Sequence, residues 1–317
     1  MRSAFFEVLL ELAETNKRLF LVVGDLGFGV TEQFARRFPE QFLNAGVAEQ
    51  NMTGIAAGLA LSGKTVFTYS IANFPILRCL EQIRNDVCYH GANVKIVAVG
   101  GGFAYGALGA THHATEDLAI LRALPGMIVV APGDPQETRA ATRAIVAHSG
   151  PCYLRLGRAG EPLVHKGPIH FQLGKAIPVQ DGGDLTLIST GGMLQTAIQV
   201  SDSLLSRGLT SRVLSMHTLK PLDEDSVVSS ARETGAVFTI EEHSLIGGLG
   251  SAVAETLAEA RVSDVIFKRF ALPSAFSCRA GSQEYLREQN GLGVDSITNA
   301  IHTALTSGRA LTANTVS

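Results

Sequence analysis

Glu49 is the first residue whose type and position could do chemistry. It precedes QNMTGIAAGLAL, a run of small and apolar residues within a stretch of helical length (48–63). An acid at a helix N-terminus is stabilised by the helix dipole by up to about 1 kcal/mol, and residue type alone favours this structural role. A carboxylate at the head of a buried helix could also exchange a proton near neutral pH, and the expected location favours that second role.

Two adjacent histidines, His112 and His113, form the second candidate site. They follow the glycine-rich segment GGGFAYGALGA (100–110), which comes after an apolar run at 93–101. Open α/β sheets bind ligands at the carboxyl ends of their strands, so these side chains could contact a substrate. A structural or solvated role is about as well supported by the residues alone. We expect no metal site here, because neighbouring loop residues rarely direct both rings at one ion and no third ligand is evident.

The same glycine-rich segment does not fit a nicotinamide-binding fingerprint. That fingerprint needs its third glycine to open a helix and an acid about 20 residues later at a strand end. Here THHATED intervenes, and Asp117 falls in a predicted helix. We therefore expect a wide loop that lines a crevice, and not a dehydrogenase.

The elements that must position these residues alternate between strands and helices, as in a parallel sheet. We expect helices at 48–63, 74–89 and 135–148, and strands at 18–23, 41–44, 64–70, 93–101, 127–131 and 152–156. Four further strand-like runs follow at 184–190, 211–216, 236–242 and 265–270. The expected fold class is α/β, with two doubly wound domains and mostly parallel sheets. The first domain would cover 1–158, a linker rich in Gly, Pro and charge 159–184, and a smaller domain 185–317.

Composition narrows the function classes. The 317 residues are 46% hydrophobic and 17% charged, which excludes disorder. The net charge is −3 without a block of Lys or Arg, so we expect neither nucleic acid nor a membrane as a partner. Glu7, Glu11 and Glu14 interrupt the apolar stripe of the first helix, unlike a secretory signal. Four cysteines without CxxC spacing suit a reducing compartment, and we predict a cytoplasmic protein.

The chain resembles the pyrimidine-binding domain of the transketolase family of thiamine-diphosphate enzymes in four ordered segments. These are GVAEQNMTGIAAGLALSGKTVF, FPILRCLEQIRND, GATHHATEDLAILRALPGMIVVAPGD and YLRLGR. A fifth, FTIEEHSLIGGLGSAV (238–253), is similar to the family's small C-terminal domain. By this resemblance, Glu241, Glu242 and His243 would be packing and interface residues.

The part of the family that this sequence lacks is informative. A family member is about twice as long, and its other half carries the diphosphate-binding domain with a GDG…N magnesium motif, which we do not find here. The resemblance therefore implies the second subunit of a split transketolase. Thiamine diphosphate would be shared with a partner chain that carries the GDG…N motif and holds Mg²⁺, in an α2β2 heterotetramer.

The resemblance also assigns roles around the cofactor. Glu49 matches the glutamate that exchanges a proton with the cofactor's aminopyrimidine. An aromatic residue stacks on that ring in the family; strict register places Pro75 there, and a one-residue shift places Phe74, which we favour with Tyr69 as the alternative. Arg78 would also bind on the cofactor side.

Substrate contacts are implied in the same way. His112 matches the histidine that hydrogen-bonds the substrate oxygen near C1, whereas His113 would orient the loop. Arg158 and, less securely, Arg2 match arginines that bind substrate phosphate through a planar fork. At three positions this sequence lacks the residue that contacts the substrate in the family. The family acts on sugars and sugar phosphates, and these differences weaken the case that the substrate here is an ordinary pentose phosphate. These positions are Gly29, Gly100 and Leu108, in place of a serine, a histidine and an aspartate.

Four functions remain to be weighed. The resemblance favours transfer of a two-carbon ketol unit from a ketose donor to an aldose acceptor. A β subunit of a 2-oxoacid dehydrogenase would share the fold, cofactor and glutamate, and half of a 1-deoxyxylulose-phosphate synthase would suit Arg78 equally well. A non-catalytic scaffold subunit is the alternative from a different class, and Glu49 argues against it.

Overall fold

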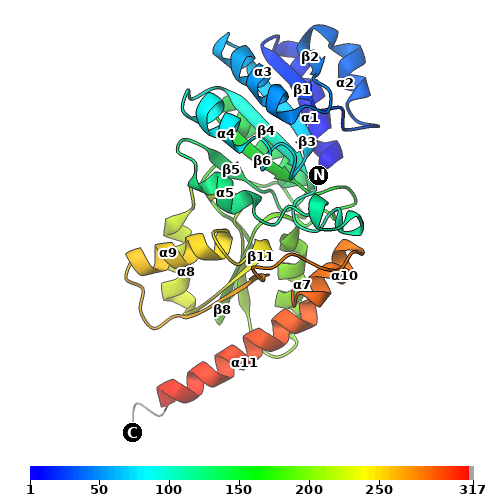
Figure 1. The fold of residues 1–317 in the computed structure, drawn as a ribbon. Coiled ribbons are helices and arrows are strands. Elements are labelled where there is room, and N and C mark those ends of the chain that lie inside the picture. The colour runs from blue at the N-terminus through cyan, green and yellow to red at the C-terminus, as the bar shows by residue number, and fades with distance from the viewer. Residues whose placement is uncertain (314–317) are drawn as a thin grey trace.

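The computed structural model describes the backbone of residues 1–313 and the side chains of residues 1–307. Two α/β units lie one above the other, the N-terminal one in blue to green and the C-terminal one in yellow-green to red (Figure 1). The seven-stranded sheet of the first has the order β10-β5-β6-β4-β3-β1-β2, and the five-stranded sheet of the second has the order β12-β11-β8-β9-β7. Every strand pairing is parallel except those of β10 with β5 and β7 with β9. The predicted fold class is thus confirmed.

The strands of the first sheet are β1 (Leu19–Val23), β2 (Phe42–Asn44), β3 (Thr65–Ile71), β4 (Val94–Val99), β5 (Ile128–Val130), β6 (Cys152–Leu156) and β10 (Thr218–Lys220). Its helices are α1 (Arg2–Thr15), α2 (Glu32–Arg37), α3 (Glu49–Leu61), α4 (Leu80–Gln82), α5 (Asp117–Ala123) and α6 (Pro135–Ala147). Helix α6 begins where its sequence predicts, because Asp134 accepts a hydrogen bond from Glu137 N and Pro135 occupies the first turn.

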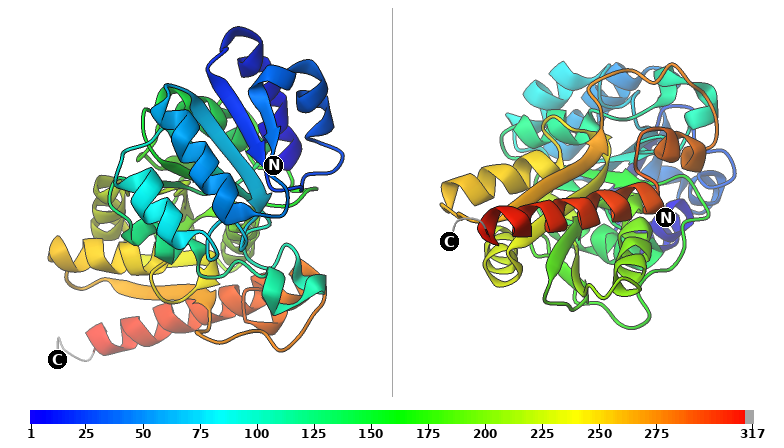
Figure 2. Two further views of the ribbon diagram at one scale, coloured as in Figure 1. Left: turned by 45° about the horizontal axis from the view of Figure 1, so that its top comes forward. Right: turned by 90° about the horizontal axis from the view of Figure 1, so that it is seen from below.

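The second sheet contains β7 (Ile177–Gln180), β8 (Leu185–Ser189), β9 (Ser211–Ser215), β11 (Ala236–Ser244) and β12 (Ile266–Leu272). Around it lie α7 (Leu194–Leu205), α8 (Glu224–Thr234), α9 (Leu249–Glu259), α10 (Gln283–Gln289) and α11 (Val294–Ala313). Helix α11 crosses the outer side of this unit, as the view from below shows (Figure 2). Among the described residues, no helix combines the length and apolar character that crossing a bilayer requires.

The structure differs from the expected elements in three places. The helix expected at 74–89 is wrong at its start, because residues 72–79 form turns and only α4 and a π-helical segment at Ile83–Cys88 follow. Pro75 accounts for this, since it disfavours a helical conformation at the residue before it and lacks an N–H. The segment expected to be a linker contains β7. Strand β10, which we did not predict, comes from the C-terminal half and completes the first sheet.

Alternation along the strands produces cores on both faces of the first sheet. Phe67, Val97 and Leu154 face a core with α1 and α6, whereas their neighbours Val66 and Ile96 face the opposite side. The core on that opposite side continues into α8 and α9 of the second unit. The two units therefore share one apolar core.

Candidate active site

The candidate site lies where the chain order of the first sheet reverses direction. From β1 the chain first forms β2 at one edge and then returns to build β3 on the other side of β1. Ligands in open α/β sheets bind outside the carboxyl ends of the strands at such a switch point. The loops after β1, β2 and β3 meet here.

Glu49 is the first residue of α3, shortly after the end of β2. Its side chain is 1% exposed, and Arg78 Nη1 donates to Oε2 at 2.7 Å. Oε1 has no hydrogen-bond partner within the part of the chain that the structure describes. Asn44 and Asp25 hydrogen-bond to each other and tie together the loops after β2 and β1, which fixes the approach to α3.

Four of the predicted site residues form a continuous row. The guanidinium of Arg78 pairs with Glu49 and lies 5.0 Å from the centroid of the Phe74 ring. The Phe74 ring meets the ring of His112 edge to face, with centroids 5.3 Å apart. Residues separated by 63 positions in the chain are thus brought together at one end of the sheet.

The loop that carries His112 is held by its neighbours. Asn73 Nδ2 donates to Thr111 O at 3.1 Å, which ties the loop to the turn after β3. His113 is buried, its Nε2 lies 3.4 Å from Gly106 O, and its ring packs against Phe103. His112 is partly exposed, whereas His113 is buried and anchors the loop.

Phe74 and Tyr69, the two candidates for a stacking ring, have different surroundings. Tyr69 is fully buried and packs against Phe5 and Phe6, with centroids 6.3 and 5.0 Å away. Burial raises the pKa of its hydroxyl well above the ordinary value. Phe74 is only partly buried, so it has a face that a ligand could cover.

The two predicted phosphate arginines gather at a different place, around Tyr105. The Arg158 guanidinium lies 5.2 Å from the centroid of the Tyr105 ring. Burial raises the pKa of Tyr105, and the positive charges of Arg158 and Arg2 oppose that rise. Arg2 Nε is buried without a hydrogen-bond partner in the described part of the chain.

Tyr105 also explains one departure from the family pattern. A Cβ at position 100 would lie 2.2 Å from the Tyr105 ring, and Gly100 has φ +95°, so no side chain fits there. Gly29, in contrast, has open space around it, and Leu108 is exposed. Sequence reasoning missed Tyr105; an aromatic residue amid the glycines of 100–109 was the available signal.

The site fits the aminopyrimidine half of thiamine diphosphate. A ring with polar nitrogens needs an apolar face to stack on and a buried hydrogen-bonding group at its edge. Phe74 offers the face, and Glu49 Oε1 offers an unpaired carboxylate oxygen. Within the described residues, no group of three or more His, Cys, Asp or Glu side chains could hold a metal ion.

Comparisons with known proteins identify the transketolase family in both halves of the chain. Residues 1–160 match the family model described as the transketolase pyrimidine-binding domain, and residues 174–297 match the transketolase C-terminal domain. The chain is 46% identical to a subunit of the apulose-4-phosphate transketolase of Phocaeicola vulgatus, over 81% of this chain and 83% of that one. It is 39% identical to the 6-deoxy-6-sulfo-D-fructose transketolase subunit SqwH of a Clostridium species, over 95% and 93%.

A solved structure described as a split gene transketolase in an inactive β4 tetramer is 40% identical. It superposes with a TM-score of 0.87 over 96% of this chain and 97% of the other. Both domains, in the same order and over nearly the whole length, are therefore accounted for by one family. The chain belongs to the transketolase family, with its pyrimidine-binding domain followed by its C-terminal domain.

Proposed function

We propose that this chain is one subunit of a split transketolase that moves a two-carbon ketol unit from a ketose to an aldose. The observation that carries the proposal is the row Glu49–Arg78–Phe74–His112, with a buried carboxylate at one end and a partly exposed imidazole at the other. Relatives named as transketolase subunits support it. The composition still favours the cytoplasm as its location.

Each residue of the row has a distinct proposed role. Thiamine diphosphate, when bound, supplies the group that accepts and stores the two-carbon unit. Phe74 binds the aminopyrimidine by stacking, and Glu49 Oε1 holds or moves a proton at its ring edge. Arg78 orients the carboxylate through Oε2. His112 donates a hydrogen bond to the substrate oxygen near C1.

A partner chain completes this site in our proposal. No metal-binding group is found among the described residues, so Mg²⁺ and the diphosphate would be held by a chain with the GDG…N motif. Relatives of nearly equal length are named as subunits, and the similar solved structure is described as an inactive tetramer of β chains alone. An α2β2 assembly is the arrangement that we propose.

The proposed donor is a ketose with an anionic group at its far end. Arg158 and Arg2 flank Tyr105, and a planar guanidinium pair suits phosphate or sulfonate oxygens. The names of the two relatives above specify a sugar phosphate and a sulfosugar. Because Tyr105 fills the space at Gly100, we expect the substrate to contact residues that differ from those that bind ordinary pentose phosphates in the family.

The test uses Glu49→Gln in the complex with its partner chain. The variant keeps the shape of the side chain and loses proton exchange, so turnover of a ketose donor should fall by roughly 100-fold or more. Glu40→Gln, an exposed change before β2, is the matched control and should keep full turnover. Normal turnover by Glu49→Gln would overturn the proposal. Turnover of a 2-oxoacid with lipoyl acylation, in place of ketol transfer, would move it to the dehydrogenase alternative.

A further inference from the structure

The long loop between β4 and α5 packs against the C-terminal unit. We call residues 100–115 the substrate loop, because they include the histidine with a proposed substrate contact. Ser244 N, at the end of β11, donates to Thr115 O at 2.7 Å. Gly281 N, just before α10, donates to Gly106 O at 3.3 Å. The position of the loop therefore depends on the second unit as well as on the first.

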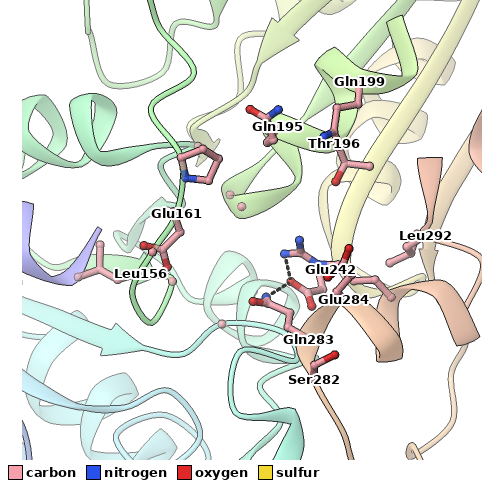
Figure 3. A pocket seen from close by; sticks show the side chains of 18 of the residues that line it. Leu156, Glu161, Gln195, Thr196, Gln199, Glu242, Ser282, Gln283, Glu284 and Leu292 are labelled. Carbon is pink, nitrogen blue, oxygen red and sulfur yellow. Dashed lines mark hydrogen bonds and ion pairs between the residues drawn. The ribbon is translucent and has the colours of Figure 1, made fainter. Parts of the chain in front are cut away.

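One side chain of the second unit also reaches the substrate loop. Glu242 on β11 is 4% exposed, and its Oε1 accepts a hydrogen bond from Phe103 N at 3.0 Å. Its Oε2 accepts from two side chains of α10, Gln283 Nε2 at 2.8 Å and Arg287 Nη2 at 2.7 Å (Figure 3). The carboxylate of Glu242 thus joins the substrate loop to both β11 and α10.

Two glycines let the backbone of the substrate loop approach the second unit closely. A Cβ on Gly102 would lie 2.5 Å from the carboxyl carbon of Glu242, and Gly102 has φ +65°, so no side chain fits there. A Cβ on Gly106 would lie 2.6 Å from Leu286 Cδ1 and 2.7 Å from Gly281 O. The loop backbone therefore lies directly against the Glu242 carboxylate at one point and against the start of α10 at another.

The contact of Glu242 with the loop leads to the two histidines. The Phe103 ring packs against the ring of His113, with centroids 4.9 Å apart. His113 Nε2 lies 3.4 Å from Gly106 O, so the same ring also contacts the middle of the loop. Because His113 is the chain neighbour of His112, a shift of Phe103 would be passed on to the imidazole of His112.

The hydrogen bond from Phe103 N to Glu242 favours one position of the loop. Among the described residues, Glu242 Oε1 has no other hydrogen-bond partner. If the loop moved away, a buried N–H and a buried carboxylate oxygen would both lose their partner, and unpaired polar groups are costly in a protein interior. Arg287 and Gln283 hold the other oxygen, which fixes the direction of the carboxylate.

We propose that Glu242 is a positioning residue for the reaction, and that it holds the substrate loop in the conformation in which His112 contacts the substrate. The inference rests on the proposed function, which assigns that contact to His112. The C-terminal unit then takes part in turnover through this carboxylate, in addition to its role in packing. Glu49 and Phe74 lie on other segments of the chain, so the cofactor contacts do not depend on Glu242.

Two double variants separate positioning from stability. Glu242→Gln/Arg287→Gln and Glu242→Met/Arg287→Met both remove the ion pair, and Gln and Met have nearly the same shape. The Gln pair keeps an oxygen that can accept from Phe103 N, and the Met pair does not.

Turnover is measured in the complex with the partner chain, with hydroxypyruvate as donor and glycolaldehyde as acceptor. Hydroxypyruvate carries the two-carbon ketol unit itself, so the result does not depend on the far end of the natural donor. We expect the Met pair to lower kcat/KM by roughly tenfold or more, because a small displacement of a contacting group costs much of the rate. The Gln pair should stay within about threefold of wild type, and the Kd of thiamine diphosphate should be the same in both.

Amide hydrogen exchange of the full chain measures the loop without turnover. Amides of residues 103–115 should exchange at least about tenfold faster in the Met pair than in the Gln pair. Glu255→Gln is the matched control, since it breaks another ion pair between the units, with Arg122, and leaves the loop contacts intact. If a double variant does not fold, Gly106→Ala probes the same contact from the loop side, with Gly183→Ala, where a Cβ has open space, as its control.

The outcomes are distinct. Equal kcat/KM in the two double variants would overturn the inference, and so would a Met pair that loses cofactor binding to the same extent as kcat/KM. If the wild-type complex transfers no ketol unit, the proposed function fails and hydrogen exchange decides the role of Glu242. A faster loop in the Met pair would then support its control of the loop, and equal exchange would overturn it.

Discussion

The ion pair between Glu49 and Arg78 is better explained as orientation than as stability. Glu49 is almost fully buried, whereas the Arg78 side chain is 48% exposed, and a pair with one exposed partner contributes little to the free energy of folding. Its geometry has a clearer effect. The guanidinium occupies Oε2 and packs on Phe74, which leaves Oε1 and one ring face available to a ligand.

Phe74→Ala tests the stacking role. Removing the ring should weaken binding of thiamine diphosphate to the assembled enzyme by roughly tenfold, because an aromatic pair contributes about 1 kcal/mol beyond its buried area. Phe38→Ala is a matched control, since Phe38 is also partly buried and carries Arg37 over its ring. Titration of the cofactor into both variants checks this. An unchanged Kd for Phe74→Ala would shift the stacking role away from this residue.

At the residue scale, the motifs selected four residues that the structure places side by side, because each motif fixes residue type and spacing over a short segment. They could not locate Tyr105 as the residue that fills the space at Gly100. That contact depends on how the loop 100–115 folds back over β4, with Gly102 and Ala114 bridged across it. Apolar residues repeat every 2 residues in a strand and every 3.6 in a helix, and these repeats predict side-chain directions there. An irregular loop has no such repeat, so its side-chain directions cannot be predicted in this way.

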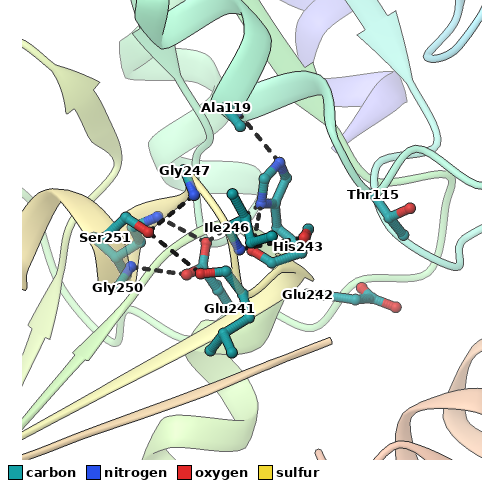
Figure 4. A network of polar contacts seen from close by, with 12 residues as sticks. Thr115, Ala119, Glu241, Glu242, His243, Ile246, Gly247, Gly250 and Ser251 are labelled. Atoms are coloured by element: carbon teal, nitrogen blue, oxygen red, sulfur yellow. Dashed lines mark hydrogen bonds and ion pairs between the residues drawn. The ribbon is translucent and has the colours of Figure 1, made fainter. Parts of the chain in front are cut away.

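At the scale of elements, a buried polar cluster fixes α5 to β6 and β11. Asp117 at the start of α5 accepts from Arg155 and from Tyr153, both on β6, and Arg155 also donates to Glu242 O on β11. Nearby, Glu241 accepts from the first N–H groups of α9, and His243 accepts from Ala119 N of α5 (Figure 4). Asp117 and His243 therefore take part in contacts between the units, whereas Glu241 holds α9 to β11 within the C-terminal unit.

Asp117→Asn should strongly destabilise the fold. Both partners of the ion pair are buried, and removing one charge leaves the guanidinium of Arg155 uncompensated, at a cost of about 3–5 kcal/mol in unfolding free energy. Glu11→Gln on α1 breaks the exposed pair with Arg143 and should change stability little. Chemical denaturation of the two variants gives the comparison. Similar stabilities would show that burial does not decide the strength of these pairs.

The junction of β9 and β10 should make stability depend on pH. His217 stacks on Phe171 with centroids 3.9 Å apart, and burial lowers its pKa to about 4. The unfolded chain takes up this proton below about 6.5, so stability is lost as pH falls from there toward 4. For one such histidine the loss between pH 7 and pH 5 is about 2 kcal/mol.

His217→Leu should therefore reduce the loss of stability between pH 7 and pH 5 by about 2 kcal/mol. His243, whose pKa burial also lowers to about 4, acts in the same direction, and Glu241, whose pKa burial raises to about 7, acts in the opposite one; both remain in the variant. Urea denaturation at pH 5 and pH 7 measures the difference for wild type and variant. An equal loss in both would mean that His217 does not titrate with folding.

Most elements were predictable, and those that were not share a cause. Long elements such as α3, α6 and β4 begin and end close to the predicted residues. Their hydrophobic patterns and helix caps depend only on neighbouring residues in the chain. Strand β10 and the edge strand β7 are short and exist through pairing with distant partners, β5 and β9. Local sequence carries little information about such pairings.

At the scale of the whole molecule, the two units pack against each other through a shared apolar core. One apolar core combines Met52 of α3 and Leu118 of α5 with Val227 of α8 and Val253 of α9. Strand β10 adds a segment of the second half to the first sheet. The C-terminal unit thus packs against the pyrimidine-binding unit and completes its sheet.

This architecture leads to a prediction about the chain by itself. The described residues provide a stacking ring and a carboxylate for the aminopyrimidine but no group of ligands for Mg²⁺. Without the metal, a diphosphate brings uncompensated negative charge and few oxygen partners. Titration of thiamine diphosphate with Mg²⁺ into this chain should therefore give no binding heat, and the same titration after addition of the partner chain should give binding. Phe74→Ala in the complex should weaken that binding, which links it to this site. Tight binding by the chain alone would contradict the split design, and absence of binding in the presence of the partner would favour the scaffold alternative.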